Sequence, residues 1–143
     1  MRPARAVSGS LAAVTTILVA AEAAWVRDQV RTGLTGPGQR VIEVTRGQEV
    51  RAAVGAQTID LVILDLQIAN QGGIATALDL RLEAAAGRLP EVPILLLLDR
   101  EADRFLAART EADAVLVKPI DAGTLRRAIK RLLSPVRSVE GGA

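Results

Sequence analysis

The segment Ile59-Asp-Leu-Val-Ile-Leu64, followed directly by Asp65, gives the clearest indication of the fold. It is nearly all apolar, which is typical of a parallel strand covered on both of its faces. We therefore predict that residues 59–64 form the central strand of a parallel sheet. Asp65 then lies at the carboxyl end of that strand.

Four more short apolar runs alternate with segments of helical spacing around this strand. The predicted strands are residues 16–20, 41–45, 59–64, 92–98 and 114–117. The predicted helices are one that carries Trp25 and four that cover residues 49–54, 74–85, 101–109 and 121–133. Five strand-helix units imply an α/β fold with a parallel sheet, right-handed crossovers and helices on both faces.

Apolar spacing also indicates how two of the helices are built. The third predicted helix is marked by the apolar residues Ile74, Ala77, Leu78, Leu82 and Ala85. The last helix begins at Asp121, which is predicted to be its N-cap. Its buried stripe is predicted to consist of Leu125, Ala128, Ile129, Leu132 and Leu133.

Length and composition indicate one domain and exclude several kinds of chemistry. The 143 residues are 50% hydrophobic, so we expect a single domain at 13–133 with flexible tails at 1–12 and 134–143. With no His and no Cys, the chain has no Ser-His-Asp triad, no Cys nucleophile and no His/Cys zinc site. The pI of about 9.9 is poor evidence for nucleic-acid binding, because almost nothing titrates between the carboxylates and the amines.

The amino-terminal region has some features of a secretion signal. Arg2 and Arg5 precede an apolar stretch, and Ala21-Glu-Ala23 is similar to a signal-peptidase site. Cleavage there would remove the first predicted strand, so we favour a cytoplasmic protein. Glu22 also interrupts an apolar run that is already too short to cross a membrane.

Charged residues follow several of the predicted strands. Glu22 follows the first strand, Asp65 the third, Asp99 the fourth and Lys118 the fifth. Because parallel strands present their carboxyl ends at one edge of the sheet, we expect Glu22, Asp65 and Lys118 to converge there. From the residues alone, Asp65 is most simply a solvated residue at a strand end, and the alternatives are a reactive site or a structural ion pair with Lys118. Asp99 is predicted to be a solvated loop acid without a role.

The chain resembles the receiver domains of two-component response regulators from about residue 15 to residue 133. The residues that carry the resemblance are Ile17-Leu-Val-Ala-Ala-Glu22, Leu61-Val-Ile-Leu-Asp65, Gly72-Gly73, Val92-Pro-Ile94 and Val117-Lys-Pro119. The resemblance implies a flavodoxin-like, doubly wound, three-layer fold with five strands in the order 2-1-3-4-5 and five helices. It also implies that Lys118-Pro119 is a cis peptide bond.

The same resemblance implies the roles of the site residues. Asp65 is the expected phosphoacceptor, and Lys118 is expected to pair with the phosphate. The expected Mg²⁺ ligands are Glu22, Asp65 and the main-chain carbonyl of Gln67. Such chemistry needs an oxygen nucleophile and cations that neutralise the phosphoryl charge.

Several positions depart from the family's pattern. Ala21 replaces one of two acids after the first strand, so we expect weaker Mg²⁺ binding. Leu98 replaces a hydroxyl residue that binds the phosphoryl group, and Asp99 replaces the small residue after it, where its charge would repel phosphate. Val115 stands where an aromatic residue reports the switch. The remaining departures are Ala69 for a proline, Gly72 for an acid, and Glu111 for a glycine. Because Glu111 replaces the glycine, we expect the predicted helix at 101–109 to end differently.

We predict a protein-binding switch rather than an enzyme, and three functions remain open. The first is a stand-alone, phosphate-accepting receiver served by a histidine kinase or another signalling protein. The second is a pseudo-receiver that binds proteins without phosphorylation. The third is a ligand-binding or catalytic flavodoxin-like protein, for which the sequence offers no Gly-rich phosphate loop. We expect no direct contact with nucleic acid or membrane, and we consider a homodimer through the fourth helix, fifth strand and fifth helix.

Overall fold

The computed structural model describes residues 14–34 and 36–134, which form a five-stranded parallel sheet in the order β2-β1-β3-β4-β5. The strands are β1 (Thr15–Ala20), β2 (Gln39–Val44), β3 (Leu61–Asp65), β4 (Ile94–Leu98) and β5 (Ala114–Val117). The predicted strand order and the central position of β3 are confirmed. Strand β1 lies inside the sheet, as the sequence required.

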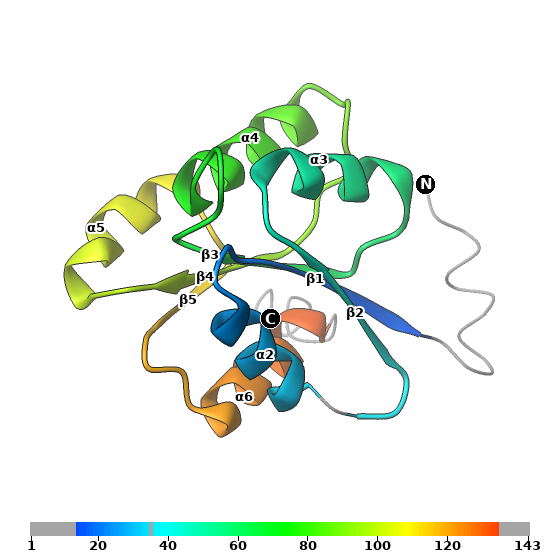
Figure 1. Cartoon of the computed structure of the whole chain (residues 1–143). Coiled ribbons are helices and arrows are strands. Elements are labelled where there is room, and N and C mark those ends of the chain that lie inside the picture. The colour runs from blue at the N-terminus through cyan, green and yellow to red at the C-terminus, as the bar shows by residue number, and fades with distance from the viewer. Residues whose placement is uncertain (1–13, 35, 135–143) are drawn as a thin grey trace, which may run out of the picture.

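Helices cover both faces of the sheet (Figure 1). The helices α3 (Gly47–Ala56), α4 (Gly73–Ala85) and α5 (Arg104–Ala107) lie on one face, and α2 (Ala24–Gly33) and α6 (Ala122–Leu133) lie on the other. Each face has its own apolar core. Successive residues of β3 alternate between these cores: Val62 and Leu64 pack toward α3 and α4, and Leu61 and Ile63 pack toward α2 and α6.

Helix α4 is turned differently from what its apolar residues suggest. Leu78 and Leu82, two of the residues that mark the helix in the sequence, are exposed, the latter by 68%. Of the marking residues Ala77 is buried as expected, and Leu80, which was not among them, is buried as well. The cause lies at the start of the helix, where a Cβ on Gly73 would overlap the carbonyl oxygen of Asp65. Close approach of this glycine to the end of β3 fixes how the helix is turned.

The predicted helix at 101–109 is broken into three short pieces. The 3₁₀ turn η1 (Glu101–Asp103) precedes α5, and a second 3₁₀ turn, η2 (Ala108–Thr110), follows it. Glu111, with φ of 56°, ends this segment in the left-handed conformation. The expectation that the helix must end differently without a glycine was therefore wrong, because Glu111 itself adopts the conformation that glycine favours.

The last helix matches its prediction in most respects. The Asp121 carboxylate accepts a hydrogen bond from the N–H of Thr124 at 2.9 Å, which confirms the N-cap. Leu125, Ala128 and Ile129 are buried, whereas the last two residues of the predicted stripe are only partly buried. Of the predicted tails at 1–12 and 134–143, only Ser134 lies within the described residues. Within the described part of the chain, no helix is long and apolar enough to cross a membrane.

Candidate functional site

Asp65 ends the central strand and is almost completely buried, with 1% of its surface exposed. One carboxylate oxygen, Oδ2, accepts a hydrogen bond from the N–H of Gln67 at 3.1 Å. The other, Oδ1, lies 2.5 Å from the ammonium nitrogen of Lys118. Asp65 and Lys118, which are far apart in the sequence, are therefore in direct contact at the carboxyl edge of the sheet.

Lys118 follows β5 and is held in place through both its main chain and its side chain. Its N–H donates to the carbonyl of Leu98 at 2.8 Å, and its bond to Pro119 is cis, as predicted. Its ammonium nitrogen also lies 2.7 Å from Oδ1 of Asp99 and 5.7 Å from the centre of the Trp25 ring. The cation is therefore shared between two carboxylates beside an aromatic face.

Asp99 is part of this cluster, contrary to the prediction of a solvated loop acid without a role. Besides its ion pair with Lys118, its Oδ2 accepts a hydrogen bond from the Gln67 side-chain amide at 3.0 Å. About a third of its side chain is exposed. The sequence offered one signal for this contact, the position of Asp99 directly after β4. The signal is weak, because a loop acid at this position is most often solvated.

Glu22 lies at the same edge but does not join the cluster. Its N–H donates to the carbonyl of Gln67 at 2.9 Å, whereas its side chain is exposed and makes no ion pair with any other described residue. Arg27, which the sequence did not single out, donates to the carbonyls of Ala21 and Glu22 at 2.8 and 2.9 Å. The main-chain groups of the loop after β1 are thus held by the Gln67 carbonyl and by the Arg27 side chain.

The three charged groups of the cluster affect one another's protonation. Burial raises the pKa of the Asp65 carboxyl above its usual value, and the hydrogen bond from Lys118 offsets only part of this effect. The hydrogen bond from Lys118 lowers the pKa of Asp99, which is closer to solvent. Burial opposes the charge on Lys118, but the two carboxylates outweigh it and raise the pKa of Lys118. Lys118 is thus firmly cationic, and Asp99 is the more readily ionised of its two partners.

Comparison with known families decides what kind of domain this is. The sequence model of the response regulator receiver domain matches residues 17–130, which is most of the chain. The chain belongs to the receiver domain family. Residues 17–130 are a response regulator receiver domain, and they lie within the five-stranded parallel sheet and its helices.

Relatives with known names agree with this assignment. The receiver domain is 32% identical over 119 residues to the KDP operon transcriptional regulatory protein KdpE of Escherichia coli, covering 82% of this chain and 50% of that protein. It is 35% identical over 97 residues to a response regulatory protein of Mycobacterium tuberculosis, covering 68% of this chain and 70% of that protein. The chain therefore spans about half the length of the transcriptional regulators that it matches.

Solved structures share the same fold at lower identity. The chemotaxis response regulator CheY4 of Vibrio cholerae superposes with a TM-score of 0.72 at 22% identity, over 84% of this chain and 99% of that one. The receiver domain of the sensor histidine kinase PA1611 of Pseudomonas aeruginosa gives a TM-score of 0.68 at 21% identity, over 85% and 98%. The second structure has a magnesium ion coordinated in its active site cleft.

The oxygen atoms at the edge of this receiver domain are of the kind that Mg²⁺ prefers. The contact between Glu22 and Gln67 places one expected ligand, the Gln67 carbonyl, beside the loop that carries another. Ala21, fully buried, supplies no further carboxylate. No three acidic side chains of residues 14–34 and 36–134 are grouped closely enough to hold a metal ion. Carboxylate and carbonyl oxygens fit Mg²⁺ in chemistry, and Glu22, Asp65 and the Gln67 carbonyl are the oxygen donors at this edge that the sequence predicted.

Positions 98 and 115, at which the sequence departs from the family's pattern, carry apolar side chains that pack in the core and make no hydrogen bonds. Leu98 is fully buried at the end of β4. Val115 and Val117 of β5 pack against the same apolar core, together with Ala107 of α5. No hydroxyl is available at position 98 to reach a phosphoryl group on Asp65.

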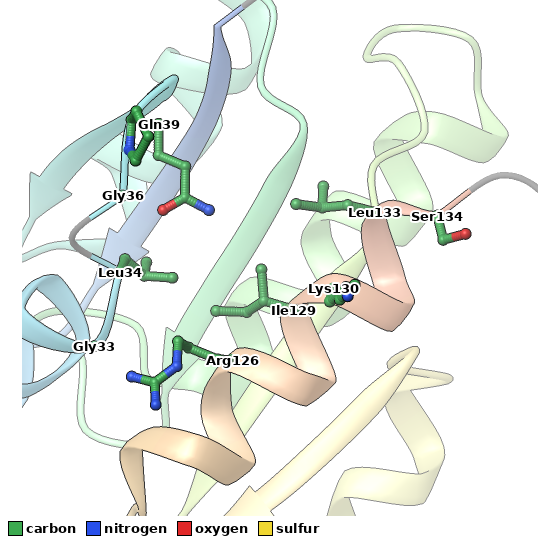
Figure 2. Close-up of a pocket in the computed structure, with 10 residues that line it drawn as sticks. Gly33, Leu34, Gly36, Gln39, Arg126, Ile129, Lys130, Leu133 and Ser134 are labelled. Atoms are coloured by element: carbon green, nitrogen blue, oxygen red, sulfur yellow. The ribbon is translucent and has the colours of Figure 1, made fainter.

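A hollow of about 510 Å³ lies away from this edge, between α6 and the residues that run from the end of α2 to the start of β2. Figure 2 shows Leu34, Ile129 and Leu133 directed into it, with Arg126 and Lys130 on the neighbouring turns of α6. None of its lining residues belongs to the Asp65 cluster. The hollow is therefore separate from the candidate phosphoacceptor site.

Proposed function

We propose that Asp65 accepts a phosphoryl group from a histidine kinase and that the receiver domain thereby acts as a protein-interaction switch. The observation that carries the proposal is the contact of the Asp65 carboxylate with the Lys118 ammonium, 2.5 Å apart, at the end of the central strand. A nucleophilic carboxylate beside a fixed cation is the arrangement that phosphoryl transfer to an aspartate needs.

The transfer is a displacement at phosphorus. An oxygen of Asp65 forms a bond to the phosphorus atom, while the bond from phosphorus to the imidazole nitrogen of a phosphohistidine breaks. The imidazole leaves and takes a proton from water, and an acyl phosphate remains on Asp65. Lys118 provides the positive charge that the incoming oxygens require.

Mg²⁺ is the cofactor that we propose, with the carboxylates of Glu22 and Asp65 and the carbonyl of Gln67 as its protein ligands. The ion would supply charge neutralisation to the phosphoryl oxygens. Because Glu22 is exposed and Ala21 supplies no carboxylate, we expect affinity to be weaker than in a site with one more acid.

The output is proposed to pass through a face made by α5, β5 and α6, either to a partner protein or to a second copy of the domain. Phe105 on α5 is 74% exposed and Leu106 beside it is also exposed, so this face offers apolar contacts. Arg126, Arg127 and Lys130 add positive charge on α6. We propose a cytoplasmic domain that is not itself an enzyme and does not contact nucleic acid directly.

Beryllofluoride, which imitates a phosphoryl group, tests the proposal. The domain would be titrated with beryllofluoride in millimolar Mg²⁺ and followed by backbone amide NMR. We expect saturable shifts around Asp65 and Lys118, and their loss in Asp65→Asn. The matched control is Asp28→Asn, an exposed acid that pairs with Arg31 and has no part in the site.

A covalent test complements the titration. Incubation with acetyl phosphate and Mg²⁺ should add one phosphoryl group to the intact mass of the protein, and Asp65→Asn should not gain it. If neither probe reacts with the unaltered domain, the phosphoacceptor function is wrong. The pseudo-receiver would then be the better description.

A further inference from the structure

Lys118 already has two anionic partners before any phosphoryl group arrives. Its ammonium lies 2.5 Å from Asp65 and 2.7 Å from Asp99. A phosphoryl group on Asp65 needs the same ammonium, because this is the cation that reaches the acceptor. Asp99 therefore stands where it competes with the phosphoryl oxygens for Lys118.

The charges at the site make this competition unavoidable. Asp65 and Asp99 together carry two negative charges against one positive charge on Lys118. Phosphorylation would add more negative charge to Asp65, which shares the Lys118 ammonium with Asp99, in a partly buried place where repulsion is poorly screened. The least costly response is for Lys118 to turn to the phosphoryl group and for Asp99 to move away.

Asp99 is also coupled to the segment that follows it. The N–H groups of Asp99 and Arg100 donate to Oδ2 of Asp103 at 3.2 and 2.9 Å, so the position of residue 99 is tied to the start of η1. The segment beyond is made of short helical pieces rather than one continuous helix. Movement of Asp99 therefore acts on the part of the chain that leads to the exposed Phe105.

We propose that Asp99 competes with the phosphoryl group for Lys118. In the unphosphorylated domain, Asp99 holds Lys118. When Asp99 releases Lys118, residues 99–110 loosen. This inference rests on the proposed phosphoacceptor function of Asp65. Asp99 would then make the polar connection between the site and the following loop. Leu98 cannot make it, because its side chain is buried and apolar.

Three proteins test the inference: the unaltered domain, Asp99→Asn, and the control Glu101→Gln. Asparagine keeps the size of the side chain and removes its charge. Glu101 lies two residues further along and pairs with Arg104, not with Lys118, so its variant has the same change in net charge. Each is titrated with beryllofluoride in Mg²⁺, with amide NMR and the fluorescence of Trp25 as readouts. Trp25 is the single tryptophan of the chain, and Lys118 lies over its ring.

We expect Asp99→Asn to bind beryllofluoride about tenfold more tightly than the unaltered domain. The affinity of Glu101→Gln should equal that of the unaltered domain within about twofold. Amide hydrogen exchange provides a second readout, because a merely structural ion pair would not change the exchange rates of residues 99–110 on ligand binding. Beryllofluoride should speed amide exchange in residues 99–110 of the unaltered domain. Asp99→Asn should show part of that increase without any ligand.

The outcomes separate this inference from the function on which it rests. Equal or weaker binding by Asp99→Asn, with binding by the unaltered domain intact, would overturn the competitor role and leave the phosphoacceptor in place. Tighter binding by Asp99→Asn than by the unaltered domain, with both proteins binding, would support the inference. If none of the proteins binds, the phosphoacceptor function fails and the competitor role fails with it.

Discussion

The two edges of the sheet carry aspartates that are used in opposite ways. At the amino edge, Asp60 accepts a hydrogen bond from the N–H of Thr16 at 2.8 Å, and Asp113 accepts one from Ile94 at the same distance. Each returns a bond from its own N–H to the carbonyl of the same partner. At the carboxyl edge, Asp65 and Asp99 instead share the side-chain cation of Lys118.

The difference shows why one edge is structural and the other is a candidate site. A carboxylate that accepts main-chain N–H groups completes the pairing of neighbouring strands, and nothing needs to move. A carboxylate that faces a flexible lysine side chain has a partner that another anion can take. Burial of a carboxylate therefore does not tell a structural role from a functional one. The donor does, because a main-chain N–H is fixed and a lysine side chain can change its partner.

Removal of Lys118 should produce the largest effect. In Lys118→Ala, Asp65 keeps a buried charge without its cation, so we expect the free energy of unfolding at neutral pH to fall by about 3–5 kcal/mol. The loss should shrink as the pH falls toward about 4, because Asp65 becomes protonated and no longer needs a cation. Urea unfolding at both pH values measures it. An equal loss at both values would contradict the explanation. Lys130→Ala, at an exposed position on α6, is the control.

Removal of Asp60 should have a smaller and purely structural effect. In Asp60→Ala the N–H of Thr16 loses its acceptor, and we expect the free energy of unfolding to fall by about 1–3 kcal/mol. Asp113→Ala should act in the same direction but less strongly, because Asp113 is more exposed. Affinity for beryllofluoride should stay unchanged in both variants that still fold. A marked change in affinity would show that the two edges are not independent.

Neutralisation of Asp65 should stabilise the fold slightly while it abolishes beryllofluoride binding. Burial raises the pKa of Asp65 in the folded state, so its ionisation opposes folding above the unfolded-state pKa. Asp65→Asn removes this cost, and we expect a gain of about 1 kcal/mol in the free energy of unfolding at pH 7. The gain should disappear below about pH 3.9, where the carboxyl is protonated in both states. A loss of stability at pH 7 would indicate that the bond to Lys118 outweighs burial.

Much of the candidate site could be predicted because parallel strands bring their carboxyl ends together. Asp65 and Lys118 each follow an apolar strand, so their contact required only that the strands be identified correctly. The partnership of Asp99 with Lys118 could not be predicted in the same way, because it depends on the directions of two side chains in loops. The exposed position of Glu22 was missed for the same reason.

Local sequence patterns are enough to predict the succession of strands and helices, the strand ends at which charges gather, and the N-cap at Asp121. These follow from apolar spacing and local hydrogen bonding, which act over a few residues. Only the tertiary structure decided how α4 is turned and which carboxylates share Lys118. Both depend on close approach between distant segments, such as Gly73 against the carbonyl of Asp65, and no local pattern encodes such an approach.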